Sequence, residues 1–233
     1  MGAVKTPEEL LNILTASSMN DRCFSHMVEY LKVGMTEIEV AEEIERTLLE
    51  LGAKRMAFPV IAVAGENGAE PHGVPSSYRI REGDFLTMDF GAVYKGYCAD
   101  MTRTVAFKRV TPYMRRVYNI VLTAQKLGIS AIRKGVSIKA VDDITRDYIE
   151  EKGFGNYYIH GTGHGVGKEV HEEPYINTKA TYKNKFKTNM AVTVEPGIYI
   201  PGKLGVRIED LVIVGDKGAI NTNHSTKELL IIK

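Results

Sequence analysis

One helical motif occurs twice in the 233-residue sequence, at an offset of 101 residues. GMTEIEVAEEIERTLLELGA begins at Gly34, and GVSIKAVDDITRDYIEEKGF begins at Gly135. The copies align glycine with glycine at both ends, and Thr36 with Ser137 near the start. A hydroxyl residue at the N-cap and a glycine after the last turn mark the beginning and end of a helix. Each copy therefore predicts one helix, and a duplicated unit limits the possible folds.

The neighbours of the two copies repeat as well. Another helix-like segment precedes each copy, at about residues 7–32 and 111–133. Runs rich in Val, Ile, Thr, Phe and Tyr follow each copy and predict strands. The first copy is followed by FPVIAVA, FLTMDFGAVY and GYCADMTRTVAF, and the second by MAVTVEPGIYI, VRIEDLVIV and ELLIIK. The pattern indicates an α+β fold of two similar halves, with helices on one side of a mostly antiparallel sheet.

No low-complexity tract or linker rich in Pro and Ser divides the chain, so we expect one domain, residues 1–233. Its pseudo-symmetric halves would span about residues 1–108 and 109–233. In such a fold a binding site is expected where the halves meet, in the concave face of the sheet.

Composition argues against several classes of partner. The formal net charge is +1, so the chain has no strong field for nucleic acid or for an anionic membrane. Its apolar runs fall well short of the roughly 20 residues that cross a bilayer, and its N-terminus shows no signal-peptide pattern. Cys23 and Cys98 lie in no metal-binding or redox spacing. We expect them to be buried thiols in a reducing compartment, most simply the cytoplasm.

A glycine-rich segment, HGTGHGVGKEVHEEP, places three of the chain's six histidines within twelve residues. They are His160, His164 and His171. Glycine at alternate positions from Gly161 to Gly167 disfavours a helix, because each glycine loses much conformational entropy on folding. Either another group approaches this backbone closely, or the imidazoles converge on a ligand.

Four acidic residues interrupt the otherwise apolar predicted strands. Asp89 and Asp100 flank YKGY, which is typical of a hairpin turn, so they are expected on adjacent antiparallel strands. Glu195 and Glu209 are expected across a similar hairpin in the second half. Taken alone, each is more often an edge residue that faces water. Burial of all four would require compensating cations.

Two divalent cations would balance the charge of these four carboxylates. The oxygen-rich ligand set suits Mn²⁺, with Co²⁺ or Zn²⁺ as alternatives, and the histidine segment would supply a nitrogen ligand. Two ions roughly 3.5 Å apart share a hydroxide that forms near neutral pH.

Two other motifs do not support an alternative function. DFG at Asp89 lacks the remaining kinase motifs, and GTGHGVG lacks the third glycine of a dinucleotide-binding loop.

Four stretches, HGTGHGVGKEVHEEP, MDFGAVYKGYCADMTRT, VEPGIYIPGKLGVRIED and VAGENGAEPHG, together resemble the Xaa-Pro peptidases. This branch comprises Xaa-Pro aminopeptidase and Xaa-Pro dipeptidase (prolidase). It belongs to the pita-bread metallopeptidases, as does methionine aminopeptidase. The resemblance covers nearly the whole chain. It implies the duplicated pita-bread (creatinase/aminopeptidase) fold, with a curved, mostly antiparallel sheet and helices on its outer face.

The resemblance also implies a set of metal ligands for two divalent ions per chain. Asp100 and Glu209 would bridge the ions. Asp89 would complete the shell of one ion, and His164 and Glu195 would complete the shell of the other.

The same resemblance implies roles for further polar residues. His72, in EPHGVP, would contact substrate or move a proton, and His160 would hydrogen-bond the scissile carbonyl. His171 would lie near the pocket for proline. Arg207 would orient carboxylates or bind a substrate carboxylate, and a purely structural ion pair is an equal alternative. Glu195 would accept a proton from the attacking water and pass it to the leaving nitrogen.

The implied activity is hydrolysis of the Xaa-Pro bond at the N-terminus of peptides or in dipeptides, by attack of a metal-bound hydroxide. The implied substrate has a free N-terminus and proline in second position, and a homodimer is left open. The N-terminal domain usual in the family is not contained in these 233 residues.

Two alternatives remain at this stage. GHGVG and HEEP are shared with methionine aminopeptidases, whereas VRIEDL, VEPGIY and NGAEPHG fit the proline branch. A non-catalytic binding module of the same fold is the second alternative, because a fold does not determine a function.

Overall fold

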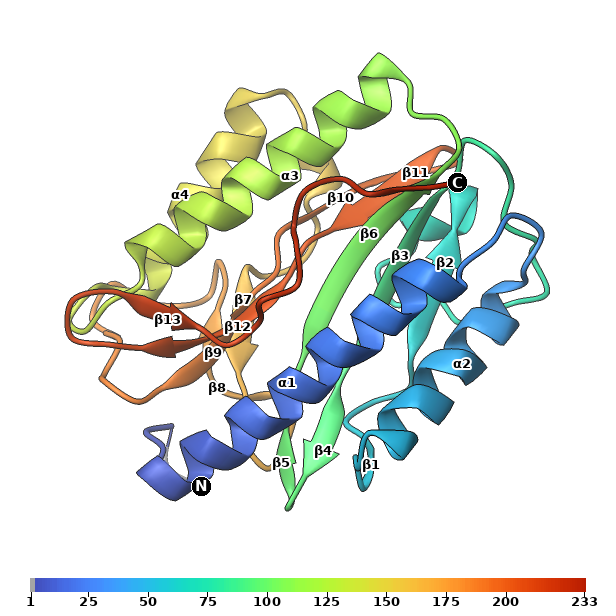
Figure 1. Ribbon diagram of the computed structural model, residues 1–233. Helices are drawn as coiled ribbons and strands as arrows, with labels where there is room; N and C mark the ends of the chain where they lie inside the picture. Colours follow the sequence, from blue (N-terminus) through green and yellow to red (C-terminus); the bar gives the residue numbers. More distant parts are fainter. Residues whose placement is uncertain (1–2) are drawn as a thin grey trace.

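The computed structural model describes residues 3–233 and contains two pairs of helices, each followed by strands (Figure 1). Met1 and Gly2, the first residues of the predicted domain, lie outside the described part. The helices are α1 (Pro7–Tyr30), α2 (Glu37–Glu50), α3 (Pro112–Ala131) and α4 (Ile138–Glu151). The predicted helix pairs are therefore confirmed, with ends that differ by a few residues.

Thr36 has its predicted role as the N-cap of α2. Its hydroxyl accepts a hydrogen bond from the Glu39 backbone N–H at 3.1 Å, and the Glu39 carboxylate accepts one from the Thr36 N–H at 2.7 Å. Ser137 occupies the N-cap of α4, but its hydroxyl makes no capping hydrogen bond. The predicted N-cap position is therefore confirmed for Ser137, but its side chain does not cap the helix. A capping box has a Glu or Gln three residues after the N-cap, and Ala140 stands at that position in α4. No side chain there can accept a hydrogen bond from the Ser137 backbone N–H.

The strands form four hydrogen-bonded sheets rather than one continuous sheet. Nearly every pairing is antiparallel, and the pairing of β14 with β6 is parallel. The four-stranded sheet contains β2 (Ile61–Ala64), β3 (Phe85–Phe90), β6 (Met101–Phe107) and β14 (Ile231–Ile232). The five-stranded sheet contains β7 (Gly163–Gly165), β8 (Glu172–Ile176), β9 (Ala191–Val194), β12 (Asp210–Val214) and β13 (Ala219–Asn221). The smaller sheets contain β1 (Arg55–Met56), β4 (Ala92–Tyr94) and β5 (Tyr97–Cys98), and β10 (Gly197–Ile200) with β11 (Leu204–Arg207).

The long predicted strands are interrupted where they pass from one sheet to the next. The breaks lie at Gly91, at residues 99–100, at 195–196 and at 208–209. All four acidic residues were expected inside strands, and this is wrong for three of them, because only Asp89 lies within a strand. A strand bends where its hydrogen-bonding partner changes. Side chains at such bends can converge, whereas those on a flat sheet alternate between its faces.

Two hairpins confirm the predicted neighbours. β4 and β5 are joined at Lys95–Gly96, where both residues have positive φ, 46° and 82°. Next to this turn, β3 and β6 pair antiparallel with Asp89 opposite Thr102. In the second half, β10 pairs with β11 and β9 pairs with β12, both antiparallel. Glu195 and Glu209 lie in the facing gaps between these two pairings.

The helices cover one face of the strands, as expected. Figure 1 shows α1 and α3 crossing the strands on the same side. α1 contacts β4 and β5, α3 contacts β9, β10 and β11, and α2 and α4 pack beside them. Met88 and Phe90 of β3 belong to the apolar core in the first half, together with Ile13 and Met27 of α1. Because side chains alternate along a strand, Asp89 between them points to the opposite face.

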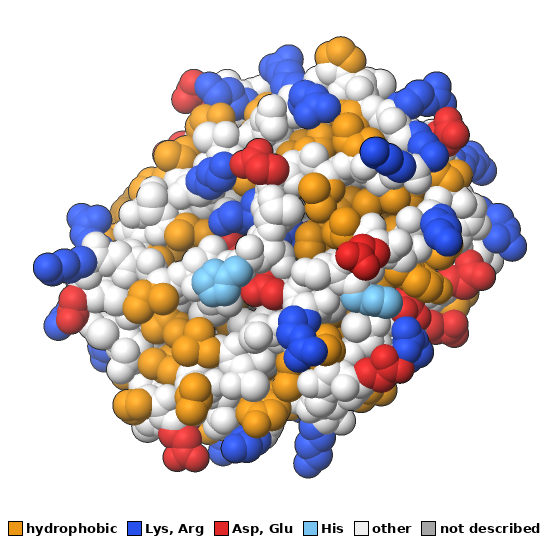
Figure 2. Space-filling model, viewed as in Figure 1, with side chains coloured by type: hydrophobic (Ala, Val, Ile, Leu, Met, Phe, Trp, Pro, Cys, Tyr) orange, Lys and Arg blue, Asp and Glu red, His pale blue; other side chains and the backbone are white. Residues whose placement is uncertain are grey.

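Charged side chains of both signs are interspersed with apolar patches on the face shown in Figure 2. This distribution agrees with the formal net charge of +1. None of the helices within residues 3–233 is both long enough and apolar enough to cross a bilayer.

The unequal caps of α2 and α4 allow a matched test. Thr36→Ala is expected to lower the free energy of unfolding by about 1 kcal/mol, because the first-turn N–H loses its acceptor. In a chain of this size the loss corresponds to about 2–4 °C in Tm. Ser137→Ala removes no capping bond and is expected to cost less than about 0.5 kcal/mol. Urea unfolding measures both, and equal losses would contradict the assignment of the caps.

Candidate metal centre

All nine side chains predicted for the site line one cavity of about 330 Å³. Five were predicted as metal ligands: Asp89, Asp100, His164, Glu195 and Glu209. The other four are His72, His160, His171 and Arg207. Apolar residues 58–61 and the segment 71–75 complete the wall. The lining comes from both predicted halves of the chain, as expected for a site where the halves meet.

Thr102 connects the two acidic pairs. Asp89 lies opposite Thr102 in the ladder between β3 and β6, and Asp100 immediately precedes β6. The Glu209 N–H donates to the Thr102 carbonyl at 3.1 Å, and the Thr102 hydroxyl donates to the Glu209 carboxylate at 2.6 Å. A carboxylate from the second half is thereby held against the strand that follows Asp100.

The glycines around His164 are required because neighbouring strands approach them closely. A Cβ on Gly163 would meet the Thr193 carbonyl oxygen at 2.0 Å. A Cβ on Gly165 would meet the Glu173 carbonyl oxygen at 2.4 Å. No side chain fits at either distance, so the segment can pair as β7 only with glycine at these positions. The close approach inferred from the sequence is therefore an approach of other backbone segments.

The ring of His164 points one nitrogen into the acidic cluster. Its Nδ1–H donates to the Gly165 carbonyl at 3.1 Å, which assigns the proton of the neutral ring to that atom. Its Nε2 lies 3.2 Å from a carboxylate oxygen of Glu195 and 3.6 Å from one of Asp100. Nε2 is thus the nitrogen available to a metal.

The acidic cluster contains buried oxygens without partners. Single ligand atoms of Asp100, His164 and Glu209 all lie within 4.8 Å of one another. One carboxylate oxygen each of Asp89, Asp100 and Glu209 is buried and has no hydrogen-bonding partner within residues 3–233. Such oxygens are costly unless a cation binds them. Convergent carboxylates with one imidazole are a ligand set for divalent ions, so the residues present fit a metal centre.

Burial and repulsion shift the pKa values of these carboxylates in the metal-free protein. Burial, together with the charges of Glu209, Asp89 and Glu195, raises the pKa of Asp100 well above its ordinary value. Burial and the charges of Glu195 and Asp89 likewise raise the pKa of Glu209. Burial also acts to raise the pKa of Glu195, but its hydrogen bond to His164 and nearby positive charges outweigh burial and lower it to about 2.

Arg207 is a buried cation within the cluster. Its guanidinium donates to Asp89 at 2.6 Å, to the Tyr199 hydroxyl at 2.8 Å and to the Thr102 hydroxyl at 3.2 Å. It also donates to the carbonyl of Pro71 at 3.2 Å. These contacts engage all three nitrogens of the guanidinium, and one of them is an ion pair with Asp89.

Tyr199 is a site residue that the sequence analysis missed. Its hydroxyl accepts from Arg207 and lies 2.8 Å from Nε2 of His160, whose Nδ1 lies 2.7 Å from the Gly161 carbonyl. Burial raises the pKa of Tyr199 to about 12 and lowers the pKa of His160. The hydroxyl is therefore protonated and donates to a neutral His160. One tyrosine in the apolar run GIYI carries no sequence signal that separates it from the core.

His171 and His72 are the two exposed histidines among the residues that line the cavity. The ring of His171 packs edge-on against that of His164, with centroids 4.4 Å apart. Burial, with the charge of His164, lowers the pKa of His171. The ring of His72 is exposed and forms no hydrogen bond within the described chain. Both rings remain free to contact a bound molecule.

A salt bridge on α4 holds the segment that presents His160. Arg146 donates to the carbonyl of His160 at 2.9 Å and to that of Tyr158 at 3.1 Å. The same guanidinium pairs with the buried Asp142 at 3.1 Å. Asp142 also accepts from the Thr162 hydroxyl at 2.8 Å, so both sides of His160 are tied to one carboxylate.

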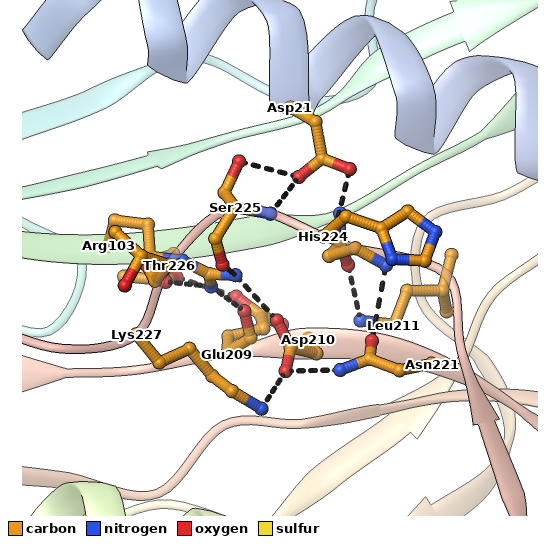
Figure 3. Close-up of polar contacts among 12 residues, drawn as sticks. Asp21, Arg103, Glu209, Asp210, Leu211, Asn221, His224, Ser225, Thr226 and Lys227 are labelled. Carbon is orange, nitrogen blue, oxygen red and sulfur yellow. Dashed lines mark hydrogen bonds and ion pairs between the residues drawn. The ribbon is translucent and has the colours of Figure 1, made fainter.

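A second polar cluster holds the chain next to Glu209 (Figure 3). The buried Asp210 accepts from Arg103 at 2.7 Å, and Arg103 also donates to the Glu209 carbonyl at 2.5 Å. The carboxylate of Asp21 on α1 accepts from the backbone N–H groups of residues 224 and 225, at 2.8 and 2.9 Å. Because Arg103 also donates to the carbonyl of residue 225, this cluster links α1, the C-terminal segment and β12.

The metallopeptidase family M24 matches residues 12–216 of the sequence. The chain belongs to this family. It is 42% identical over 229 residues to the uncharacterized peptidase YqhT of Bacillus subtilis, covering 98% of this chain and 64% of YqhT. It resembles the structure of the Xaa-Pro dipeptidase from Bacillus anthracis, with TM-score 0.96 and 44% identity over 98% of this chain and 64% of that one. It also resembles the X-Pro aminopeptidase from Thermotoga maritima, with TM-score 0.95 and 36% identity over 99% and 65%.

These likenesses confirm the pita-bread fold that the sequence motifs implied. The chain spans about two thirds of the length of each of these relatives. The M24 match covers the strands and loops that carry every predicted site residue.

Removal of one carboxylate is expected to act in opposite directions with and without metal. In EDTA, Asp100→Asn is expected to raise Tm, because it relieves repulsion in the buried cluster. The pKa of Asp100 is raised, so the metal-free wild type loses stability as pH rises above about 4, the ordinary carboxyl value. The gain from Asp100→Asn is therefore expected to grow between pH 5 and pH 8.

With Mn²⁺ at about 100 times its Kd, the wild type is expected to gain about 2.7 kcal/mol, and the Asp100→Asn protein far less. Thermal unfolding with and without Mn²⁺ measures both effects. Glu45→Gln, at an exposed position on α2, removes the same charge away from the cavity and serves as control. An equal response of wild type and Asp100→Asn to Mn²⁺ would exclude Asp100 from the ligand set.

Proposed function

We propose that this chain carries the catalytic site of a dinuclear-metal peptidase that hydrolyses the Xaa-Pro bond at the N-terminus of peptides or in dipeptides. The observation that carries the proposal is the set of buried, unpartnered carboxylate oxygens around His164. They line the cavity that also contains three further histidines. Membership of family M24, and likeness to a dipeptidase and an aminopeptidase that act on Xaa-Pro bonds, support it.

The five ligands predicted from the sequence would hold two divalent ions, and Asp100 and Glu209 would contact both. Arg207 changes the charge balance inferred from the sequence. Four carboxylates carry four negative charges and Arg207 neutralises one, so two divalent cations leave one positive charge for a hydroxide ion to balance. When bound, the ions supply such a hydroxide near neutral pH and polarise the scissile carbonyl. Mn²⁺ is the proposed ion because the ligands are mainly oxygen.

Side chains of the protein would transfer protons, contact the substrate and orient the carboxylates. Glu195 would accept a proton from the attacking water and deliver it to the leaving nitrogen. His72 and His171, whose rings are free, would contact the substrate or move protons. His160 donates through Nδ1 to Gly161 and accepts at Nε2 from Tyr199, so a bond to the scissile carbonyl requires the tyrosine hydroxyl to turn away and Nε2 to gain a proton. The bonds of Arg207 favour orientation of Asp89 over binding of a substrate carboxylate.

Preference for proline would come from the apolar wall of the cavity. Phe58, Pro59, Val60 and Ile61 line the cavity together with the segment that carries His72. The tertiary amide before proline has no N–H, so a site that recognises this bond needs shape rather than a hydrogen bond to that nitrogen. The apolar wall and the titles of the two structural relatives support proline in second position.

Two further expectations stay proposals. Cys23 and Cys98 are free and buried, which supports residence in a reducing compartment such as the cytoplasm. Assembly as a homodimer remains open.

A hydrolysis panel tests the proposed activity. With Mn²⁺, the protein is expected to cleave an Xaa-Pro dipeptide or an Xaa-Pro-Yaa tripeptide, and with EDTA to cleave neither. The preferred length would distinguish a dipeptidase from an aminopeptidase. Cleavage of a peptide that begins Met-Ala, with both proline peptides intact, would identify a methionine aminopeptidase instead. Binding of Mn²⁺ without cleavage of any substrate would favour a binding module.

His171→Ala separates metal binding from turnover. The variant is expected to keep the full Tm increase caused by Mn²⁺, because His171 packs against the ring of His164 and is not itself a proposed ligand. Its kcat is expected to fall by about 100-fold, the usual contribution of one acid–base group. Thermal unfolding and steady-state kinetics give the two values. Loss of the Mn²⁺ effect would place His171 among the ligands.

A further inference from the structure

Glu37, the first residue of α2, has a completely buried side chain. A buried carboxylate is costly unless several donors surround it. It lies 35 positions before His72 and was not among the predicted site residues. The position of Glu37 at the start of a helix does not by itself explain why its carboxylate is buried.

The partners of Glu37 are the two ends of one loop. At the start of the loop, the Ala64 N–H donates to Glu37 at 2.7 Å and the Asn67 amide donates at 3.1 Å. At the end, Ser76 donates through its N–H at 3.0 Å and through its hydroxyl at 2.6 Å. All four groups are donors, so a carboxylate satisfies them and a neutral amide does not. Glu37 thus closes the loop at residues 64–76.

This loop carries His72 into the cavity. Its middle is fastened to the carboxylate cluster, because Arg207 donates to the Pro71 carbonyl at 3.2 Å. It also packs tightly on β11, where a Cβ on Gly205 would meet the Gly68 carbonyl oxygen at 1.7 Å. The ring of His72 has no hydrogen bond of its own within the described residues. The position of His72 therefore depends on how the loop is held.

In the second half, the corresponding helix α4 forms without a carboxylate at this position. At the offset of 101, Ile138 occupies the position of Glu37 and is also buried. The segment that presents His160 is held differently, by Asp142 and Arg146 further along α4. A buried carboxylate at the first helical position is thus found only in the half that has to close the His72 loop.

We propose that Glu37 is a positioning residue for His72: it closes the loop at residues 64–76 and so sets the place of the imidazole in the cavity. The proposal rests on the proposed peptidase function for its effect on catalysis. Its structural part, the closure of the loop by Glu37, holds independently of the reaction.

The test compares Glu37→Gln with Glu39→Gln, two residues away on the same helix. Glu39 caps Thr36 and has no contact with the loop, so its variant controls for damage to α2. For Xaa-Pro hydrolysis with Mn²⁺, Glu37→Gln is expected to lower kcat by about 10- to 100-fold, because small misplacements of a catalytic group have effects of this size. KM and the Mn²⁺-dependent rise in Tm are expected to change little, and Glu39→Gln is expected to keep its kcat.

A double-mutant cycle with His72→Ala separates positioning from general damage. If Glu37 acts through His72, Glu37→Gln lowers kcat less than about 2-fold in the His72→Ala background. An equal fall in both backgrounds, or no fall in the wild-type background, overturns the proposal. Ser76→Ala, which removes one donor to Glu37, provides a milder variant if Glu37→Gln does not fold.

Hydrogen exchange provides a measure that does not depend on activity. Glu37→Gln is expected to speed exchange of the amides in residues 64–76, and Glu39→Gln is expected to leave them unchanged. Unchanged exchange in Glu37→Gln overturns loop closure, whatever the kinetics show. If the wild type cleaves no substrate but the loop loosens in Glu37→Gln alone, the proposed function fails while the closure of the loop stands.

Discussion

The constraint on which the structure depends is the burial of four carboxylates in one cavity. Like charges at this spacing repel, and burial strengthens the repulsion because water no longer screens it. Arg207, His164 and Thr102 offset part of it with hydrogen bonds and charge. Within residues 3–233, three of the carboxylate oxygens remain without partners, and a divalent cation would bind these atoms. The surrounding contacts have to hold this arrangement against its own repulsion.

The fold meets this requirement where its strands change sheets. Three of the four acidic residues lie at breaks between strands, and the fourth lies one residue before the end of β3. At a break the backbone can turn, so carboxylates from two hairpins reach a common point. Apolar neighbours on the same segments face the helices and form the core. The bends therefore separate the polar cavity from the core within the same segments.

The histidines around the cavity are held by a second layer of buried acids. α2 closes the His72 loop with Glu37, whereas α4 holds the segment around His160 through Asp142 and Arg146. The C-terminal segment and Arg103 similarly support the backbone at Glu209 (Figure 3). The two halves have the same order of elements, but they use different side chains to hold the segments that carry the histidines. Repetition of the fold thus did not require repetition of these contacts.

Local signals in the sequence were sufficient for the helices, and they selected nine residues that line one cavity. Caps, terminal glycines and apolar runs act over a few residues, so the helix pairs and hairpins follow from them. The candidate ligands were recognisable because acids and histidine in apolar or glycine-rich segments are unusual. Only the tertiary structure decided the partners of Arg207 and the roles of Tyr199 and Glu37. Most of these contacts join segments far apart in the sequence, and whether a buried group finds a partner depends on the register and packing of the whole chain.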